Sequence, residues 1–210
     1  SLIAQGKGVG VATNSHKPIN NLLSTVEAPA LEAGIEFFGL KKSTNGREET
    51  CFDGRFIHDV QRNDEILASL NGPASCQLIA GTAWLFADAG LDQLLDYLFV
   101  DEAGQVALAN LVAMGTSAQN IILLGDQMQL GQPIQGVHPG RSGESSLEYL
   151  LNGQATISPD KGIFLGTTRR MHPDICHFIS DAIYDGRLQT EPANTNQRLV
   201  LGRGAHPLLK

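Results

Sequence analysis

The chain has 210 residues, of which 42% are hydrophobic and 18% are charged, an ordinary composition for a globular α/β protein with a sizeable core. Its formal net charge of −7 argues against a protein that coats nucleic acid by bulk electrostatic attraction, although a narrow track touching a few phosphates stays compatible with it. The sequence has no long apolar run, no signal peptide and no CxxC spacing among its three cysteines, which predicts a cytoplasmic protein with reduced thiols and no membrane partner.

Short apolar runs bounded by glycine or polar residues recur along the chain and are typical of buried strands. In chain order they cover residues 9–13, 76–82, 96–100, 120–126 and 162–168. Stretches with helical spacing lie between several of them, and this alternation predicts an α/β fold whose mostly parallel sheet is covered by helices on both faces. Residues 27–75 are polar and weakly periodic, so we interpret them as an insertion that is partly loop.

Polar clusters follow four of these runs. They are Asn14-Ser15-His16, Gly81-Thr82, Asp101-Glu102 and Asp126-Gln127. In parallel sheets ligands bind beyond the carboxyl ends of the strands, so the four clusters together predict a binding site at that edge.

The stretch FVDEAGQ, residues 99–105, ends an apolar run in paired carboxylates. A magnesium ion bound with a nucleotide needs a hard oxygen ligand at a rigid strand tip, which Asp101 offers. The adjacent Glu102 is then placed to orient or deprotonate a water molecule for attack on a terminal phosphate. The alternative is that the strand ends in acidic residues only because it reaches solvent.

Two further stretches carry candidate phosphate contacts. In LLGDQMQLGQP, residues 123–133, the amide of Gln127 beside Asp126 is suited to sense a γ-phosphate without adding negative charge; the alternative is a polar turn. In TTRRMHPDICHFIS, residues 167–180, Arg169 or Arg170 is suited to contact a transferring phosphoryl group; the alternative is a solvated basic pair.

The second stretch also contains His172, Cys176 and His177 at helical spacing, which resembles a metal site. We disfavour that interpretation because no fourth ligand is evident and because His-Pro is a common helix start.

Taken together, the stretches resemble the superfamily 1 helicases, in the branch that holds the nonsense-mediated-decay RNA helicases and the replication nuclease-helicases. The nearest resemblance is to bacterial proteins that join a RecB-like nuclease to such a helicase. VATNSHKPINNLL looks like motif Ia, IAGTAWL like motif Ic, FVDEAGQ like motif II, LLGDQMQLGQP like motif III and TTRRMHPDICHFIS like motif IV. The order and spacing match over nearly the whole chain.

The resemblance implies a RecA-like P-loop NTPase domain over residues 1–161 and the start of a second such domain over residues 162–210. It implies ATP and magnesium as cofactors, with Asp101 holding the metal, Glu102 activating water, Asp126 and Gln127 at the nucleotide, and Arg170 reaching the γ-phosphate. It also implies single-stranded nucleic acid, DNA in preference to RNA, as the partner, and a nuclease domain in the same parent chain.

The residues lining the strand would be Asn14, Ser15, His16, Gly81 and Thr82. Trp84 is either a stacking surface for a base or a core residue.

Two departures from the family pattern matter. Thr168-Arg169 stands where the family has Gln-Tyr, which leaves the role of Arg169 open. No stretch fits the phosphate-loop pattern GxxxxGK(S/T), and the glycines of GKGVGVAT, residues 6–13, precede a strand instead of leading into a helix.

We therefore expect an incomplete RecA-like sheet in a fragment of a longer protein, inactive by itself. The missing phosphate-loop strand is expected between the strands ending in Asp101 and Asp126. Its absence should leave a gap of about 9–10 Å, a collapse or a foreign segment there. Finding the two strands as regular neighbours would contradict this.

Two alternatives for the function stay open. One is a degenerate nucleic-acid-binding module that keeps the fold without using a nucleotide. The other is a metal-dependent phosphohydrolase or nuclease that uses Asp101 and Glu102 directly, which requires further carboxylates converging on them.

Overall fold

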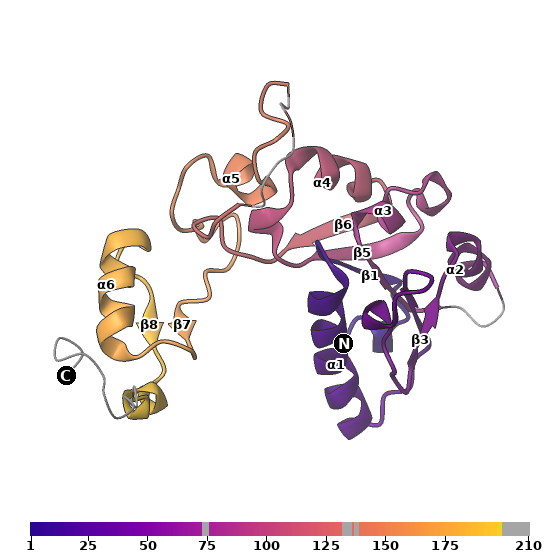
Figure 1. Cartoon of the computed structure of the whole chain (residues 1–210), viewed down its shortest axis with the longest axis horizontal. Helices are drawn as coiled ribbons and strands as arrows, with labels where there is room; N and C mark the ends of the chain where they lie inside the picture. The colour runs from indigo at the N-terminus through magenta and orange to yellow at the C-terminus, as the bar shows by residue number, and fades with distance from the viewer. Residues whose placement is uncertain (73–75, 132–135, 137–138, 199–210) are drawn as a thin grey trace. The chain divides into compact units, whose positions relative to one another are not determined.

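The computed structural model describes residues 1–72, 76–131, 136 and 139–198. The chain divides into two compact units, Ser1–Asn152 and Gly153–Lys210, which are described separately (Figure 1). The division falls after Asn152, whereas the domain boundary expected from the sequence lies after residue 161.

The first unit contains a six-stranded sheet in the order β3-β2-β4-β1-β5-β6, and every neighbouring pair is parallel. The strands are β1 (Val9–Ala12), β2 (Gly39–Lys42), β3 (Ile57–Val60), β4 (Leu78–Gly81), β5 (Leu95–Val100) and β6 (Ala118–Leu123). The predicted α/β fold with a parallel sheet is confirmed.

Alternate residues of the central strands enter cores on opposite faces of the sheet. Leu78 and Ala80 of β4 pack on one face, while Ile79 between them packs on the other. Because side chains alternate along a strand, a continuous apolar run is what a strand covered on both faces requires. The short runs seen in the sequence have this physical origin.

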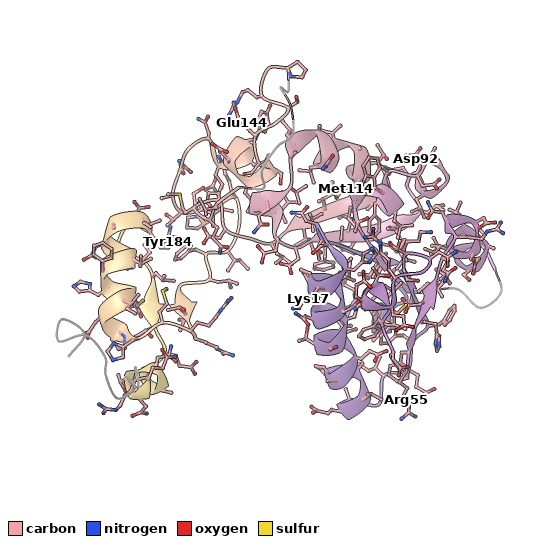
Figure 2. The ribbon with its side chains drawn as sticks, in the orientation of Figure 1. Lys17, Arg55, Asp92, Met114, Glu144 and Tyr184 are labelled. Carbon is pink, nitrogen blue, oxygen red and sulfur yellow. The ribbon has the colours of Figure 1, made fainter. Side chains whose placement is uncertain are left out.

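Helices cover both faces, as expected. The helix α1 (His16–Glu32) supplies Ile19 and Leu23 to one core. The other core receives side chains from α2 (Asn63–Leu70), α3 (Ala83–Phe86), α4 (Leu108–Gly115) and α5 (Ser146–Leu151). Met114, labelled on α4 in Figure 2, is among them. Short 3-10 turns lie at η1 (Ile3–Gln5), η2 (Glu48–Thr50), η3 (Ala89–Leu91) and η4 (Ala103–Gln105).

The expectation of a missing strand between the strands ending in Asp101 and Asp126 is wrong. Strands β5 and β6 are direct parallel neighbours, with Leu95 opposite Ala118 and Val100 opposite Leu123. The ladder continues past the strand ends, where the Leu124 amide donates to the Val100 carbonyl at 2.9 Å. Both strands have six residues and pair along their length, so no unpaired backbone edge is left between them.

Residues 27–75, which we interpreted as an insertion that is partly loop, contribute strands to the sheet in their described part. This stretch finishes α1 and contributes β2, β3 and α2. The apolar-run criterion missed both strands because each carries charged or polar side chains, such as Lys41 in β2 and Asp59 in β3. Strands near the edge of a sheet tolerate such residues better than central ones.

The second unit is small. A two-residue parallel pair joins β7 (Thr167–Thr168) to β8 (Gln189–Thr190), beside α6 (Pro173–Ile183) and η5 (Pro192–Asn196). Of the strand expected over residues 162–168, only β7 forms. Residues 199–210 of the expected second domain lie outside the described residues. Across the described residues of both units, no helix is long and apolar enough to span a membrane.

Candidate functional site

Parallel pairing brings the polar strand ends to one edge of the sheet. Ala12, at the end of β1, is paired with Gly81 of β4 on one side and with Val100 of β5 on the other. The segments that follow these three strands therefore leave the sheet at the same level. Val100 is in turn paired with Leu123 of β6, so the structure gathers at one edge the four clusters that the sequence analysis singled out.

The paired carboxylates form a tight corner directly after β5. The Asp101 amide donates to the Ala12 carbonyl at 2.9 Å, which continues the ladder with β1. The Asp101 carboxylate accepts a hydrogen bond from the Glu102 amide at 3.0 Å. Glu102 itself has φ of 54°, in the left-handed region, which costs a non-glycine residue about 1–2 kcal/mol. Such strain is concentrated at functional sites.

Two glycines let this corner pack backbone against backbone on the loop after β6. The Ala103 amide donates to the Leu124 carbonyl at 2.8 Å. A Cβ on Gly104 would lie 2.2 Å from the Asp126 carbonyl oxygen, and one on Gly125, at φ of 152°, would lie 2.8 Å from the Ala103 nitrogen. The loops carrying Asp101-Glu102 and Asp126-Gln127 are therefore held in direct contact.

Asp126 also has a local structural role. Its carboxylate accepts hydrogen bonds from the Met128 amide at 3.0 Å and from the Gln129 side chain at 3.2 Å. The polar turn considered for this stretch is thus present, at the same position as the candidate nucleotide contact. Residues 132 and 133 at the end of the same stretch lie outside the described residues.

The residues present fit one part of a magnesium–nucleotide site. Asp101 and Glu102 are partly exposed and offer the oxygen ligands that magnesium prefers. The glycine-rich segment before β1 is used elsewhere: Lys7 pairs with the Asp96 carboxylate at 2.8 Å, and the Gly8 amide donates to the same carboxylate at 2.8 Å. These contacts lie at the amino ends of β1 and β5, at the opposite edge from Asp101. The segment therefore provides no phosphate cradle.

A nuclease-like metal site requires several converging ligands. Within the parts of the chain that the structure describes, no group of three or more His, Cys, Asp or Glu side chains could hold a metal ion. The phosphohydrolase alternative therefore receives no support from these residues.

The basic pair of the second unit separates into two environments. The Arg169 guanidinium lies 3.4 Å from the Glu191 carboxylate. Arg170 is exposed, and its side chain has no ion pair among the described residues. Arg170 is thus the more available of the two for an anionic ligand.

The histidine and cysteine of the same stretch serve the helix. His172 caps α6, its ring accepting from the Asp174 amide at 3.3 Å, and Pro173 begins the helix. Cys176 is buried, whereas the side chain of His177 is 82% exposed. The helix-start interpretation of His-Pro is confirmed.

The expected nucleic-acid residues lie at the ends of β1 and β4. Ser15 is the residue before α1, and Thr82 is the residue before α3. Neither hydroxyl caps its helix. The His16 ring lies 3.3 Å from the Thr44 hydroxyl, and burial lowers the pKa of its imidazole, with the charge of nearby Lys41 lowering it further. His16 therefore stays neutral at pH 7 and contributes hydrogen bonding, not charge.

A cavity of about 560 Å³ joins two of these residues, His16 and Thr82, to others that the sequence analysis did not assign. Lys42 and Arg62 line it from the ends of β2 and β3, and Trp84 lines it from α3. Recognising that KK ends one short strand and that QRN follows another would have identified the two basic residues. Trp84 is 86% exposed, so its interpretation as a core residue is wrong.

Comparison with known proteins gives one informative match. No protein-family model matches the chain. The chain is 24% identical over 216 residues to an Arabidopsis thaliana protein named DNA replication ATP-dependent helicase/nuclease JHS1. The alignment includes the whole chain, and the chain spans 15% of the length of that relative. Over its whole length the chain is therefore similar to a segment of a helicase/nuclease, which supports a helicase-related relationship.

Proposed function

We propose that this chain is part of an ATP-dependent nucleic-acid helicase of superfamily 1, acting on single-stranded DNA. The observation that carries the proposal is the backbone-to-backbone packing of the Asp101-Glu102 corner on the Asp126-Gln127 turn at the carboxyl edge of a parallel sheet. The strand-lining candidates follow neighbouring strands at that same edge. Similarity to a helicase/nuclease along the whole chain supports the proposal independently.

In this proposal each residue has a distinct task. Asp101 holds magnesium, and Glu102 orients and deprotonates the attacking water. Asp126 and Gln127 contact the nucleotide from the neighbouring turn, and Arg170 contributes its guanidinium to the γ-phosphate. Arg169 is left to its pairing with Glu191. Bound ATP with magnesium supplies the phosphoryl group whose transfer to water drives movement along the strand.

The proposal has consequences for the rest of the protein. No stretch of the sequence fits the phosphate-loop pattern, so in this proposal the backbone amides and the lysine that hold the β- and γ-phosphates come from another part of the protein. The isolated chain is then inactive as an ATPase. A nuclease domain in the same protein and a cytoplasmic location belong to the same proposal.

The test uses the full-length protein that carries this segment. Glu102→Gln is expected to lower single-strand-stimulated ATP hydrolysis by orders of magnitude while ATP affinity changes little, because the carboxylate handles the water and binding rests on other groups. The matched control is Glu32→Gln, the same change at the exposed last residue of α1. Equal loss of affinity and turnover on Glu102→Gln would contradict the assignment.

A second candidate is a nucleic-acid-binding module that uses no nucleotide. It is favoured by the engagement of Lys7 and Gly8 with Asp96, which leaves the glycine-rich segment unavailable to phosphates. This candidate predicts that the full-length protein binds single strands with an affinity indifferent to ATP and to Glu102→Gln. The helicase proposal predicts that both change the affinity or the rate of release.

A further inference from the structure

A group of buried polar atoms lies under the first turns of α1, at the end of the helix that Lys17 marks in Figure 2. Among the residues that the structure describes, four side-chain atoms of this group are buried and have no hydrogen-bond partner. They are His16 Nδ1, Asn20 Oδ1, Lys41 Nζ and Asp59 Oδ1. Buried polar side chains in native proteins are nearly always bonded, either to protein or to ordered water. These four atoms therefore call for a common partner.

The four atoms come from a helix and from the strand pair that it covers. His16 and Asn20 are four residues apart in α1, so they lie on one face of the helix. Lys41 and Asp59 are direct partners on β2 and β3. Ile57, two residues before Asp59 and on the same face of β3, packs in one core with Ile19 of α1. The side chains of the strand pair therefore point towards the helix.

Two further observations join the helix to the strand pair. Asn20 donates through Nδ2 to the Cys51 carbonyl at 2.8 Å, and the amide of the next residue, Phe52, donates to Asp59 Oδ2 at 2.6 Å. Burial lowers the pKa of the His16 ring, and the charges of Lys41 and Asp59 then act on that pKa in opposite directions. The four unpartnered atoms are therefore gathered where α1 covers β2 and β3.

The donors and acceptors of this group match a water molecule. Lys41 Nζ can only donate, whereas Asp59 Oδ1 and Asn20 Oδ1 can only accept. A buried water molecule donates two hydrogen bonds and accepts up to two, so it can serve the ammonium and both oxygens. The Lys41 and Asp59 atoms are 3.5 Å apart, which is longer than a good direct hydrogen bond and suits a bridge.

The same set of groups disfavours an ion. A halide at this position would lie against the Asp59 carboxylate, and a metal cation would lie against the Lys41 ammonium. The Lys41 side chain is 0% exposed, so neither repulsion would be screened by bulk solvent.

We propose that one internal water molecule binds between α1 and the β2–β3 pair, accepts a hydrogen bond from Lys41, donates to Asp59 and Asn20, and orients the His16 ring. Both protons of the water are used by the two oxygens, so the neutral His16 ring carries its proton on Nδ1 and donates it to the water. Its Nε2 then accepts from the Thr44 hydroxyl, 3.3 Å away. His16 is thereby a positioning residue for Thr44. Neither a nucleotide nor a nucleic acid takes part in this site, so it stands apart from the proposed function.

A crystal structure of the 210-residue chain, at a resolution that shows ordered water, tests the site directly. One density peak is expected within hydrogen-bond distance of Lys41 Nζ, Asp59 Oδ1 and Asn20 Oδ1. Absence of this peak would overturn the site. A peak that gains anomalous signal in crystals soaked in bromide would overturn water as the ligand and indicate an anion.

The position of the proton on His16 is a readout that a merely structural role would not move, because it is set by the hydrogen bonds of the ring. Long-range proton–nitrogen correlation spectra distinguish the Nδ1–H from the Nε2–H form, and His16→Gln identifies the signal among the six histidines. The original chain is expected to show mainly Nδ1–H. Asn20→Ala removes one acceptor and frees a proton of the water for His16, so the ratio of the two forms is expected to shift towards Nε2–H.

The control is Asn21→Ala, the same change at the exposed neighbour of Asn20 in α1, which is expected to leave the ratio unaltered. A His16 ring that is mainly Nε2–H in the original chain would overturn the water bridge. An Nδ1–H form that Asn20→Ala does not change would also overturn it, because a bond to a protein group would then hold the ring. None of these outcomes depends on the Glu102→Gln experiment, which decides the proposed function separately.

Discussion

At the scale of single residues, the unusual group is Lys41. Its side chain is 0% exposed, and its ammonium lies 3.5 Å from the carboxylate of Asp59, its direct partner on β3. Within the described residues neither the Lys41 ammonium nor the nearer Asp59 oxygen has a hydrogen-bond partner. The other Asp59 oxygen accepts from the Phe52 amide at 2.6 Å. Desolvation of such a pair offsets much of its attraction, so it is weak evidence of stabilisation.

Asp59→Asn is expected to lower the free energy of unfolding at pH 7 by roughly 3 kcal/mol, because it leaves the buried ammonium unpaired. Lys41→Met removes that charge, and the double variant is expected to recover most of the loss. Urea unfolding followed by far-ultraviolet circular dichroism measures the three variants. An equal cost of Asp59→Asn with and without Lys41 would contradict the coupling.

The pH dependence of the same group has a defined sign. Burial lowers the pKa of Lys41 below its ordinary value of 10.5, with Asp59 opposing the shift. Between the lowered pKa and 10.5 the unfolded chain binds a proton that the folded chain does not, so stability rises with pH through that window. The wild-type chain should therefore gain stability relative to Lys41→Met as the pH is raised towards 10.5.

At the scale of elements, the contact between the two loops after β5 and β6 depends on Gly104. Gly104→Ala is expected to lower the free energy of unfolding by about 1–3 kcal/mol, since the new methyl would lie 2.2 Å from the Asp126 carbonyl oxygen. Gly131→Ala, where nothing lies within 4 Å of the added methyl, is the control, expected within about 0.5 kcal/mol of the original chain.

Hydrogen exchange gives a local readout of this loop contact. The Ala103 amide, bonded to the Leu124 carbonyl, should lose protection in Gly104→Ala and keep it in Gly131→Ala. Unchanged protection in both variants would show that the loops accommodate the methyl.

The strands that could be predicted from the sequence are those that contain a run of apolar residues, whether the strand is fully buried, as β1 and β4 are, or partly exposed, as β6 is. The strands β1, β4, β5 and β6 follow runs of apolar residues, and their ends place Asp101 and Asp126 at one edge. The strands β2 and β3 could not be predicted in this way, because Lys41 and Asp59 break the apolar pattern. These two residues are accommodated in the sheet as an ion pair with each other.

The direct pairing of β5 with β6 could not be predicted from the sequence pattern either. Strand order depends on contacts between distant segments, and residue type along one strand does not encode which strand lies beside it. For the same reason the cavity residues Lys42 and Arg62 could not be joined to Trp84 before the sheet order was known.

At the scale of the whole molecule, the first unit carries both hydrophobic cores, and α5 is part of it. The Ser146 hydroxyl donates to the Ala103 carbonyl at 2.7 Å, and Leu147 belongs to the core. A chain of residues 1–152 is therefore expected to unfold in one cooperative transition. A chain of residues 1–144 is expected to lose about 1–3 kcal/mol for the two hydrogen bonds that Ser146 donates, one to the Ala103 carbonyl and one to the Val106 carbonyl, in addition to the lost burial of Leu147. Urea unfolding of the two truncated chains checks this. Equal stability would mean that α5 is dispensable.

The sheet order also determines when each strand can pair during synthesis. Strand β1 lies in the middle of the sheet, but both of its partner strands come later in the sequence, with Val9 paired to Leu78 of β4 and to Tyr97 of β5. During synthesis the backbone of β1 therefore stays unpaired until both partner strands have left the ribosome. Chains dominated by such distant pairings fold slowly and expose aggregation-prone strands in the meantime. Gly10 at the second position of β1 lowers the tendency of the waiting strand to pair wrongly. In the finished sheet the same glycine leaves the space that Phe86 and Leu98 fill.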